Sequence, residues 1–131
     1  MSDYTIKRLE EVDDVLGDYP GEMRMMTEEL EAEQVAFTFR RMPQHTGGKG
    51  SYGHRHKSQE EIYFVVSGKL QFKLGDDIVE LEGGAVVRVA PATWRSVWND
   101  EPEDAELVIV SKRVEGGSRE DAEYLENFWP A

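Results

Sequence analysis

Three side chains near the middle of the chain have the types and the spacing of metal ligands. His54 and His56 are separated by one residue, and Glu61 follows five residues after His56. Residues two apart on an extended strand project from the same face, so both imidazoles can reach one point. The odd spacing to Glu61 would place it on the opposite face of an uninterrupted strand, but the turn-forming residues 57–59 can reset the register.

Two imidazoles and one carboxylate that meet at one point form a three-ligand set. Such a set leaves coordination positions open for water or substrate, which is typical of a catalytic rather than a structural metal site. Its nitrogen and oxygen donors suit Fe(II), Mn(II), Ni(II) or Zn(II). The sequence therefore predicts a divalent transition metal held by His54, His56 and Glu61. The third histidine, His45, has no partner at ligand spacing, and we expect it at the surface.

The residues that follow Glu61 alternate in the manner of short strands separated by turns. Strand-like runs that are β-branched, aromatic or alternating occupy residues 62–66, 69–74, 78–81, 85–90, 96–98 and 105–110. Glycine, proline, aspartate and asparagine separate these runs. Strands at such short intervals predict an all-β fold, an antiparallel barrel or sandwich.

The flanking segments give weaker signals. Residues 23–34 have high helix propensity and residues 35–41 alternate like a strand, so we expect a strand, a short acidic turn or helical piece, and a second strand. Residues 118–121 have the composition of a helix start, which predicts a short helical C-terminal tail with Leu125, Phe128 and Trp129 on its apolar face. We expect this tail to pack on the barrel or on a partner.

Length and composition exclude several classes of protein. The 131 residues predict one domain over residues 1–131, and the absence of cysteine excludes disulfides, thiolate zinc sites and cysteine nucleophiles. A formal net charge of −12 makes nucleic-acid and membrane partners improbable, so the expected partner is a small molecule. No apolar run approaches membrane-spanning length and the first residues lack a signal-peptide layout, which predicts a cytoplasmic location.

The segment GKGSYGHRHKSQEEIYFVVSG resembles the first signature motif of the cupin superfamily. Every fixed position of that motif is matched, by Gly48, His54, His56, Glu61 and Gly68. The six-residue interval before Gly68 favours Glu61 over Glu60 as the carboxylate. The resemblance implies a cupin-type jelly-roll β-barrel covering about residues 35–111, with a metal near its centre and frequent dimerisation, so we expect a homodimer.

The second cupin motif is only partly present, in the segment GAVVRVAPATWRSVWN. Gly84 and Asn99 match in type and separation, but Ala90 stands where the motif has proline, Ala92 replaces glycine, and Arg95 replaces the fourth metal ligand, histidine. A guanidinium carries a permanent positive charge and cannot bind a metal. We therefore expect weaker metal affinity than a complete ligand set would give.

Two hypotheses follow from Arg95. In one, a metal is retained and Arg95 clamps an anionic group of a small substrate, with Tyr63 orienting it or acting in proton transfer; filling the barrel is the alternative role for Tyr63. The protein would then oxidise, isomerise or decarboxylate a small, anionic metabolite. In the other, Arg95 pairs with Glu61, and the protein is a non-catalytic small-molecule-binding or metal-free module. Trp94 and Trp98 lie on the opposite face from Arg95, under a second layer or in a dimer contact.

Overall fold

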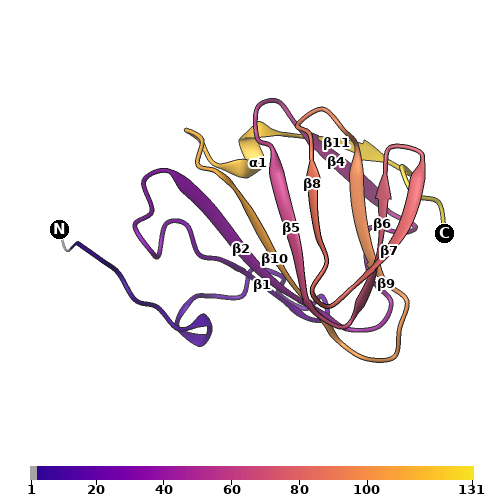
Figure 1. Cartoon of the computed structure of the whole chain (residues 1–131), viewed down its shortest axis with the longest axis horizontal. Helices are drawn as coiled ribbons and strands as arrows, with labels where there is room; N and C mark the ends of the chain where they lie inside the picture. Colours follow the sequence, from indigo (N-terminus) through magenta and orange to yellow (C-terminus); the bar gives the residue numbers. More distant parts are fainter. Residues whose placement is uncertain (1–2) are drawn as a thin grey trace.

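A computed structural model describes residues 3–131, which fold as two facing antiparallel β-sheets (Figure 1). The strands are β1 (Glu22–Met25), β2 (Val35–Met42), β3 (Thr46–Gly47), β4 (Tyr52–His56), β5 (Glu61–Ser67), β6 (Lys69–Leu74), β7 (Asp77–Glu82), β8 (Val86–Val89), β9 (Arg95–Asn99), β10 (Ala105–Lys112) and β11 (Ala122–Glu126). Within residues 3–131, helical structure is limited to the 3-10 turn η1 (Leu9–Glu11) and the single-turn helix α1 (Ser118–Asp121). The predicted all-β class is confirmed.

The two sheets have the strand orders of a jelly-roll barrel. One sheet runs β1-β2-β10-β5-β8, and the other runs β11-β4-β9-β6-β7 with β3 beside β9. Consecutive strands such as β4 and β5 lie in different sheets, so the chain crosses repeatedly between the layers. This arrangement confirms the predicted barrel and brings residues distant in sequence to one interior.

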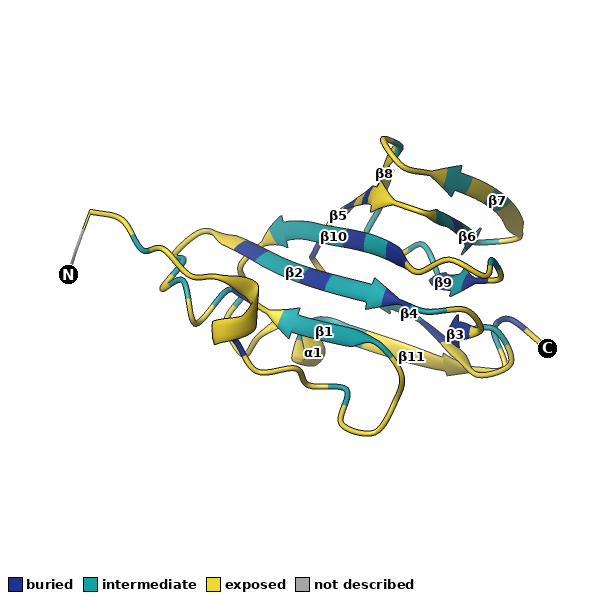
Figure 2. Ribbon diagram, turned by 90° about the horizontal axis from the view of Figure 1, so that it is seen from below, coloured by how far each residue is buried: buried dark blue, intermediate teal, exposed yellow. Residues whose placement is uncertain are grey.

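Alternation of buried and exposed side chains positions the core between the sheets. On β5, Tyr63 and Val65 are buried while their sequence neighbours are exposed, and on β6 Leu70 and Phe72 are fully buried. Figure 2 shows buried residues between less buried ones along β2 and β10, although β2 does not alternate with a period of two. Burying one face of each strand fixes its register, because a one-residue slip would move every apolar side chain to the solvent face.

The turn between β5 and β6 explains the last glycine of the first motif. Gly68 has φ +79°, a conformation that side-chain-bearing residues rarely adopt. A Cβ on Gly68 would also lie 2.7 Å from the Cα of Ala105 on β10. Glycine is therefore required both by the backbone conformation of the turn and by the approach of β10.

The N-terminal flank follows the predicted order. β1 and β2 pair in antiparallel fashion, and the acidic segment between them forms turns rather than a helix. Met23 pairs with Arg40 and Met25 with Thr38, which places both methionines on the inner face of the sheet. These methionines line the interior cavity described below.

The C-terminal flank has the predicted helix at residues 118–121 but differs from the prediction beyond it. Helix α1 ends after one turn, and the residues expected to form its apolar face lie in β11 and the turn that follows. β11 pairs with β4 along its whole length, from Ala122 opposite His56 to Glu126 opposite Tyr52 (Figure 1). Without β11, β4 would be an edge strand with unpaired backbone groups, and pairing with that edge outweighs the local helix signal.

Gly53 on β4 leaves room for the tail. A Cβ on Gly53 would overlap the ring of Phe128 and lie 2.9 Å from the backbone oxygen of Arg95. We expect Gly53→Ala to lower the free energy of unfolding by about 1–3 kcal/mol, since overpacking costs this much. Urea unfolding measures the change. In a double-mutant cycle with Phe128→Ala, the two losses should not add; additive losses would contradict the assigned contact.

Among residues 3–131, none of the helices has the length and apolar character needed to cross a membrane.

Candidate functional site

The strands β4 and β5 place the three predicted metal ligands at one end of the barrel interior. β4 carries both histidines and is held between β9, where His54 pairs with Arg95, and β11. The turn at residues 57–59 then reverses the chain, and Glu61 begins β5 with its side chain facing inward, on the same face as Tyr63. The turn therefore changes the inward-facing parity between β4 and β5, so that Glu61 faces the same interior as the two histidines despite the odd spacing.

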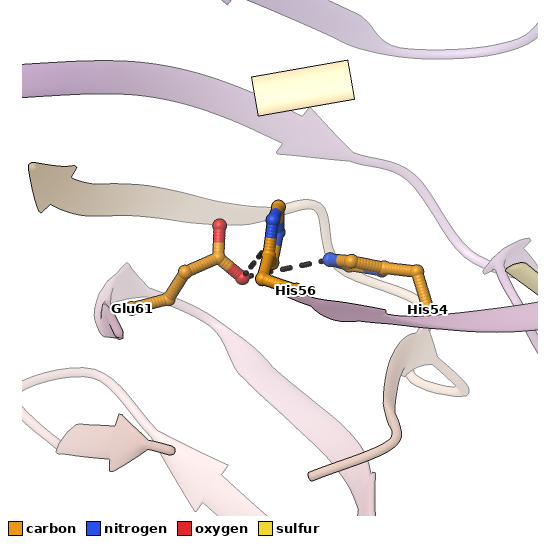
Figure 3. Close-up of side chains that lie close together, drawn as sticks. All are labelled: His54, His56 and Glu61. Carbon is orange, nitrogen blue, oxygen red and sulfur yellow. Dashed lines mark ion pairs between the residues drawn. The ribbon is translucent and has the colours of Figure 1, made fainter. Parts of the chain in front are cut away.

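The structure brings His54, His56 and Glu61 together. The Nε2 atoms of His54 and His56 each lie 3.5 Å from Oε1 of Glu61, and Figure 3 shows both rings directed at this oxygen. The two imidazoles meet edge to face, with ring centroids 5.1 Å apart. One donor atom from each residue lies within 4.8 Å of the others.

This donor set fits a divalent transition metal. Metal–nitrogen and metal–oxygen bonds of about 2.0–2.2 Å place neighbouring ligand atoms roughly 3–3.6 Å apart, which matches the nitrogen–oxygen distances in this cluster. Three protein ligands leave open positions, as in catalytic sites. The cluster can hold an ion, and the donors do not select among Fe, Mn, Ni and Zn.

The protonation states of the cluster favour metal binding. Burial lowers the pKa of His54, so its imidazole is neutral at pH 7 and has a free lone pair. Burial alone would raise the pKa of Glu61, but contacts from His54, His56 and Tyr63 outweigh burial and lower it, so the carboxylate is ionised. Both groups are thus in the form that a metal requires.

Asp121, at the end of α1, supports the cluster from the second sheet's edge. Its Oδ2 lies 3.2 Å from Nδ1 of His56 and accepts the backbone N–H groups of Ser58 and Gln59, while Oδ1 accepts the Ser58 hydroxyl at 2.7 Å. A carboxylate at Nδ1 holds the proton there and leaves Nε2 free for a metal. The sequence did not predict this role of Asp121, because no motif or spacing in residues 118–121 connects this segment with the histidines.

We expect Asp121→Ala to weaken metal binding by about 10–100-fold, the usual cost of removing a carboxylate that orients a ligating histidine. Asp121→Asn should lose less, because the amide oxygen still accepts a hydrogen bond. Asp100→Ala is the matched control, since Asp100 lies 3.8 Å from the exposed His45. Zn(II) titration by calorimetry measures the affinities, and equal affinities in Asp121→Ala and Asp100→Ala would rule out the orienting role.

Arg95 occupies the remaining side of Glu61. Its Nε lies 3.3 Å from Oε1 of Glu61, and its Nη1 donates to the backbone oxygens of Pro91 and Thr93 at 3.1 and 2.8 Å. The side chain is 0% exposed, and Arg95 is absent from the residues that line the cavity. Two arrangements were considered for Arg95, contact with a substrate anion and pairing with Glu61, and the structure has the ion pair with Glu61.

Tyr63 fills the barrel, as one of the two roles considered for it requires, and also contacts the ligand cluster. Its hydroxyl donates to Oε1 of Glu61 at 2.7 Å, and the ring packs edge to face on Phe72 in the core, with centroids 5.6 Å apart. Burial, followed by the nearby Glu61 carboxylate, raises the pKa of Tyr63 well above its usual value. The phenol is therefore a hydrogen-bond donor at neutral pH, and it lines the cavity.

The remaining chemistry-bearing residues lie away from the cluster. His45 is exposed and stacks on Trp98, and Glu60 is exposed and pairs with Arg88. Trp94 contacts the C-terminal Phe128, with ring centroids 6.4 Å apart. The tail therefore covers Trp94 within this chain.

The three ligands open onto a cavity of about 470 Å³, within the range of small-molecule sites. Its far wall comes from the N-terminal segment, β1, β2 and β10. Apolar side chains make up much of this wall, including Val15, Leu16, Met23, Met25, Ala36 and Ile109. The phenols of Tyr19, Tyr52 and Tyr63 also line it. Polar side chains, among them Thr38, Arg40 and Arg119, share the lining with the apolar residues and the three ligands.

Comparisons with known proteins agree with this architecture. The profile of the cupin domain family matches residues 41–111. A cupin protein from Bacteroides fragilis superposes with a TM-score of 0.69 at 20% identity, covering 88% of each chain. A predicted oxalate decarboxylase from Thermotoga maritima superposes with a TM-score of 0.66 at 20% identity, covering 84% of this chain and 100% of the other.

A further structural neighbour is a protein of Acidithiobacillus ferrooxidans that is provisionally assigned as a sugar phosphate isomerase. It superposes with a TM-score of 0.62 at 18% identity, covering 72% of this chain and 60% of its own length. No curated protein matches the chain. At these identities the structural neighbours establish the fold alone. Since the family profile spans more than half of the sequence and the two-sheet barrel is present, this chain belongs to the cupin domain family.

Proposed function

We propose that this protein is a metal-dependent enzyme that oxidises, isomerises or decarboxylates a small, anionic metabolite. One observation carries the proposal: two histidine nitrogens and one carboxylate oxygen converge at the end of a cavity large enough for a metabolite. Structural neighbours assigned as an isomerase and a decarboxylase agree with this range of reactions.

His54, His56 and Glu61 would hold the ion. A divalent metal at an open site supplies Lewis-acid activation and orientation of substrate oxygen atoms. The other residues prepare the site. Tyr63 donates its hydroxyl proton to Glu61 in a hydrogen bond, and the apolar wall excludes water from bound substrate.

Metal content of the purified protein tests the proposal. We expect a near-stoichiometric divalent transition metal in the wild type and loss of most of it in His54→Ala. His45→Ala is the matched control, because His45 is exposed and outside the cluster, and it should keep the metal. Elemental analysis gives the ratios. An equal metal content in both variants would show that bound metal lies elsewhere.

A second candidate function is a metal-free binding module, favoured by the ion pair between Arg95 and Glu61. The guanidinium already supplies a positive charge at the oxygen that a metal would share. This reading predicts no metal in the wild type even after incubation with Zn(II) or Fe(II), together with binding of an organic ligand in the same cavity.

A further inference from the structure

The arginines of this acidic protein are nearly all paired. Seven of the nine form an ion pair with a carboxylate among residues 3–131. The two exceptions in that range, Arg40 and Arg119, both line the cavity. Arg119 is exposed, whereas Arg40 is partly buried within the barrel. Both arginines that lack a carboxylate partner in this range therefore lie at the pocket.

The position of Arg40 on β2 explains why it has no partner in the protein. Arg40 pairs with Met23 on β1 and Leu107 on β10, both apolar. Its Nε is buried and has no hydrogen-bond partner within residues 3–131. Arg41, the next residue, projects from the other face and pairs with Glu22 and Asp104 at 2.7 and 2.8 Å. Two neighbouring arginines thus have opposite surroundings.

A partly buried cation without an anion is costly, because it loses hydration without gaining a compensating charge. Burial lowers the pKa of Arg40, and the groups that oppose this shift are the phenols of Tyr19, Tyr63 and Tyr52. Neutral phenols do not balance a charge. Uncompensated groups of this kind are typical of binding sites, where the ligand supplies the missing partner.

We propose that Arg40 binds the carboxylate of a small organic acid in the cavity. The planar guanidinium presents parallel N–H donors that match a carboxylate, and one partly buried cation suits a monoanion better than a phosphate dianion. The inference deepens the proposed function, since it names the substrate class of the same pocket. It also assigns the anion-binding role considered for Arg95 to Arg40.

The walls of the cavity define the rest of the ligand. Val15, Leu16, Met25 and Ile109 surround the pocket with apolar surface, which favours an acid with an apolar body. Tyr63 lines the same cavity as Arg40, and its hydroxyl donates to Glu61. An acid held by Arg40 would therefore direct its other end toward the histidine cluster.

Matched probes test the inference on the full-length protein. Acetate, pyruvate, lactate, benzoate and phenylacetate are compared with their primary amides, and phenyl phosphate is added as a dianion. Calorimetry or ligand-observed NMR gives the affinities for wild type, Arg40→Met, Arg41→Met and His54→Ala. We expect at least one acid to bind about tenfold or more tightly than its amide, and Arg40→Met to abolish this preference. Arg41→Met, which removes the same charge from the other face, should retain it.

Stability provides a second readout. Removing an unbalanced buried charge should raise the melting temperature of the ligand-free protein in Arg40→Met, whereas Arg41→Met should lower it slightly by breaking two ion pairs. A lower melting temperature in Arg40→Met would indicate a structural role and overturn the inference. An acid preference that is absent from wild type, or that survives Arg40→Met, would also overturn it, as would tighter binding of phenyl phosphate.

The His54→Ala arm separates this inference from the proposed function. If His54→Ala still binds the acid more tightly than its amide, carboxylate binding by Arg40 is supported even if the purified protein contains no metal. If the preference for the acid over its amide is lost in His54→Ala but kept in Arg40→Met, anion binding belongs to the metal cluster. That result would refute the role of Arg40 and leave the proposed function standing.

Discussion

Replacing Glu61 with leucine should lower the free energy of unfolding by about 3–5 kcal/mol, the usual cost of leaving one member of a buried ion pair without its partner. Arg95 is fully buried, and its remaining acceptors are two backbone oxygens. Urea unfolding in the presence of a chelator measures the loss without a contribution from metal. Arg95→Met should be milder, because Glu61 keeps the Tyr63 hydroxyl and both imidazoles.

Two further variants make this expectation specific. The double variant Glu61→Leu/Arg95→Met should recover most of the lost stability, since apolar residues can replace a buried ion pair at little cost. Glu60→Leu is the control, because Glu60 is exposed and its pair with Arg88 is solvated, which limits its effect to within about 1 kcal/mol. If Glu61→Leu loses no more free energy of unfolding than Glu60→Leu, the ion pair between Glu61 and Arg95 does not contribute to stability as a buried pair.

The second large effect concerns metal affinity. We expect Arg95→His to strengthen Zn(II) binding by about 100- to 1,000-fold. A divalent ion bound to the Glu61 carboxylate presents a net charge of about +1. Two unit charges about 4 Å apart repel by about 4 kcal/mol at an effective dielectric constant of 20, and each 1.4 kcal/mol is tenfold in affinity. The Arg95 Nε lies 3.3 Å from the Glu61 oxygen that a metal would share, so its charge acts at close range. The imidazole also adds a donor.

Arg88→His is the matched control for that substitution. Arg88 is exposed and pairs with Glu60, so the same change there alters the net charge equally without affecting the cluster. Calorimetric titration with Zn(II) compares both variants with wild type. If Arg95→His binds Zn(II) no more tightly than Arg88→His does, the Arg95 guanidinium does not oppose metal binding, and its charge does not lower the metal affinity of the wild type.

The barrel could be predicted because the residue types within each strand indicate that the segment is extended and partly buried. In β6 the apolar residues alternate with polar ones, and Leu70 and Phe72 are buried, so period-two alternation determines both the strand and the face that points inward. β5 is apolar along most of its length, so its composition predicts the strand but not which face is buried. The spacing of His54 and His56 matches the same two-residue period, so the sequence also predicted that both imidazoles lie on one face of a strand. The ligand cluster thus follows from local pattern together with one turn.

The remaining features depend on contacts that local pattern does not encode. Residues 118–121 have the composition of a helix start, but β11 forms because β4 offers an open edge far away in sequence. Arg40 and Arg41 are identical in type and adjacent, and only the register of β2 determines which one faces the cavity. Asp121 and Arg40 were therefore missed for the same reason: their roles arise from tertiary structure.

The pairing of β11 with β4 has a consequence for biosynthesis. His56 and Asp121 are 65 residues apart, so the histidines leave the ribosome well before the carboxylate that orients one of them. At about 5–20 residues per second, this separation corresponds to a delay of about 3–13 s. We expect the nascent barrel to bind an ion tightly only after the tail has docked and Asp121 contacts His56.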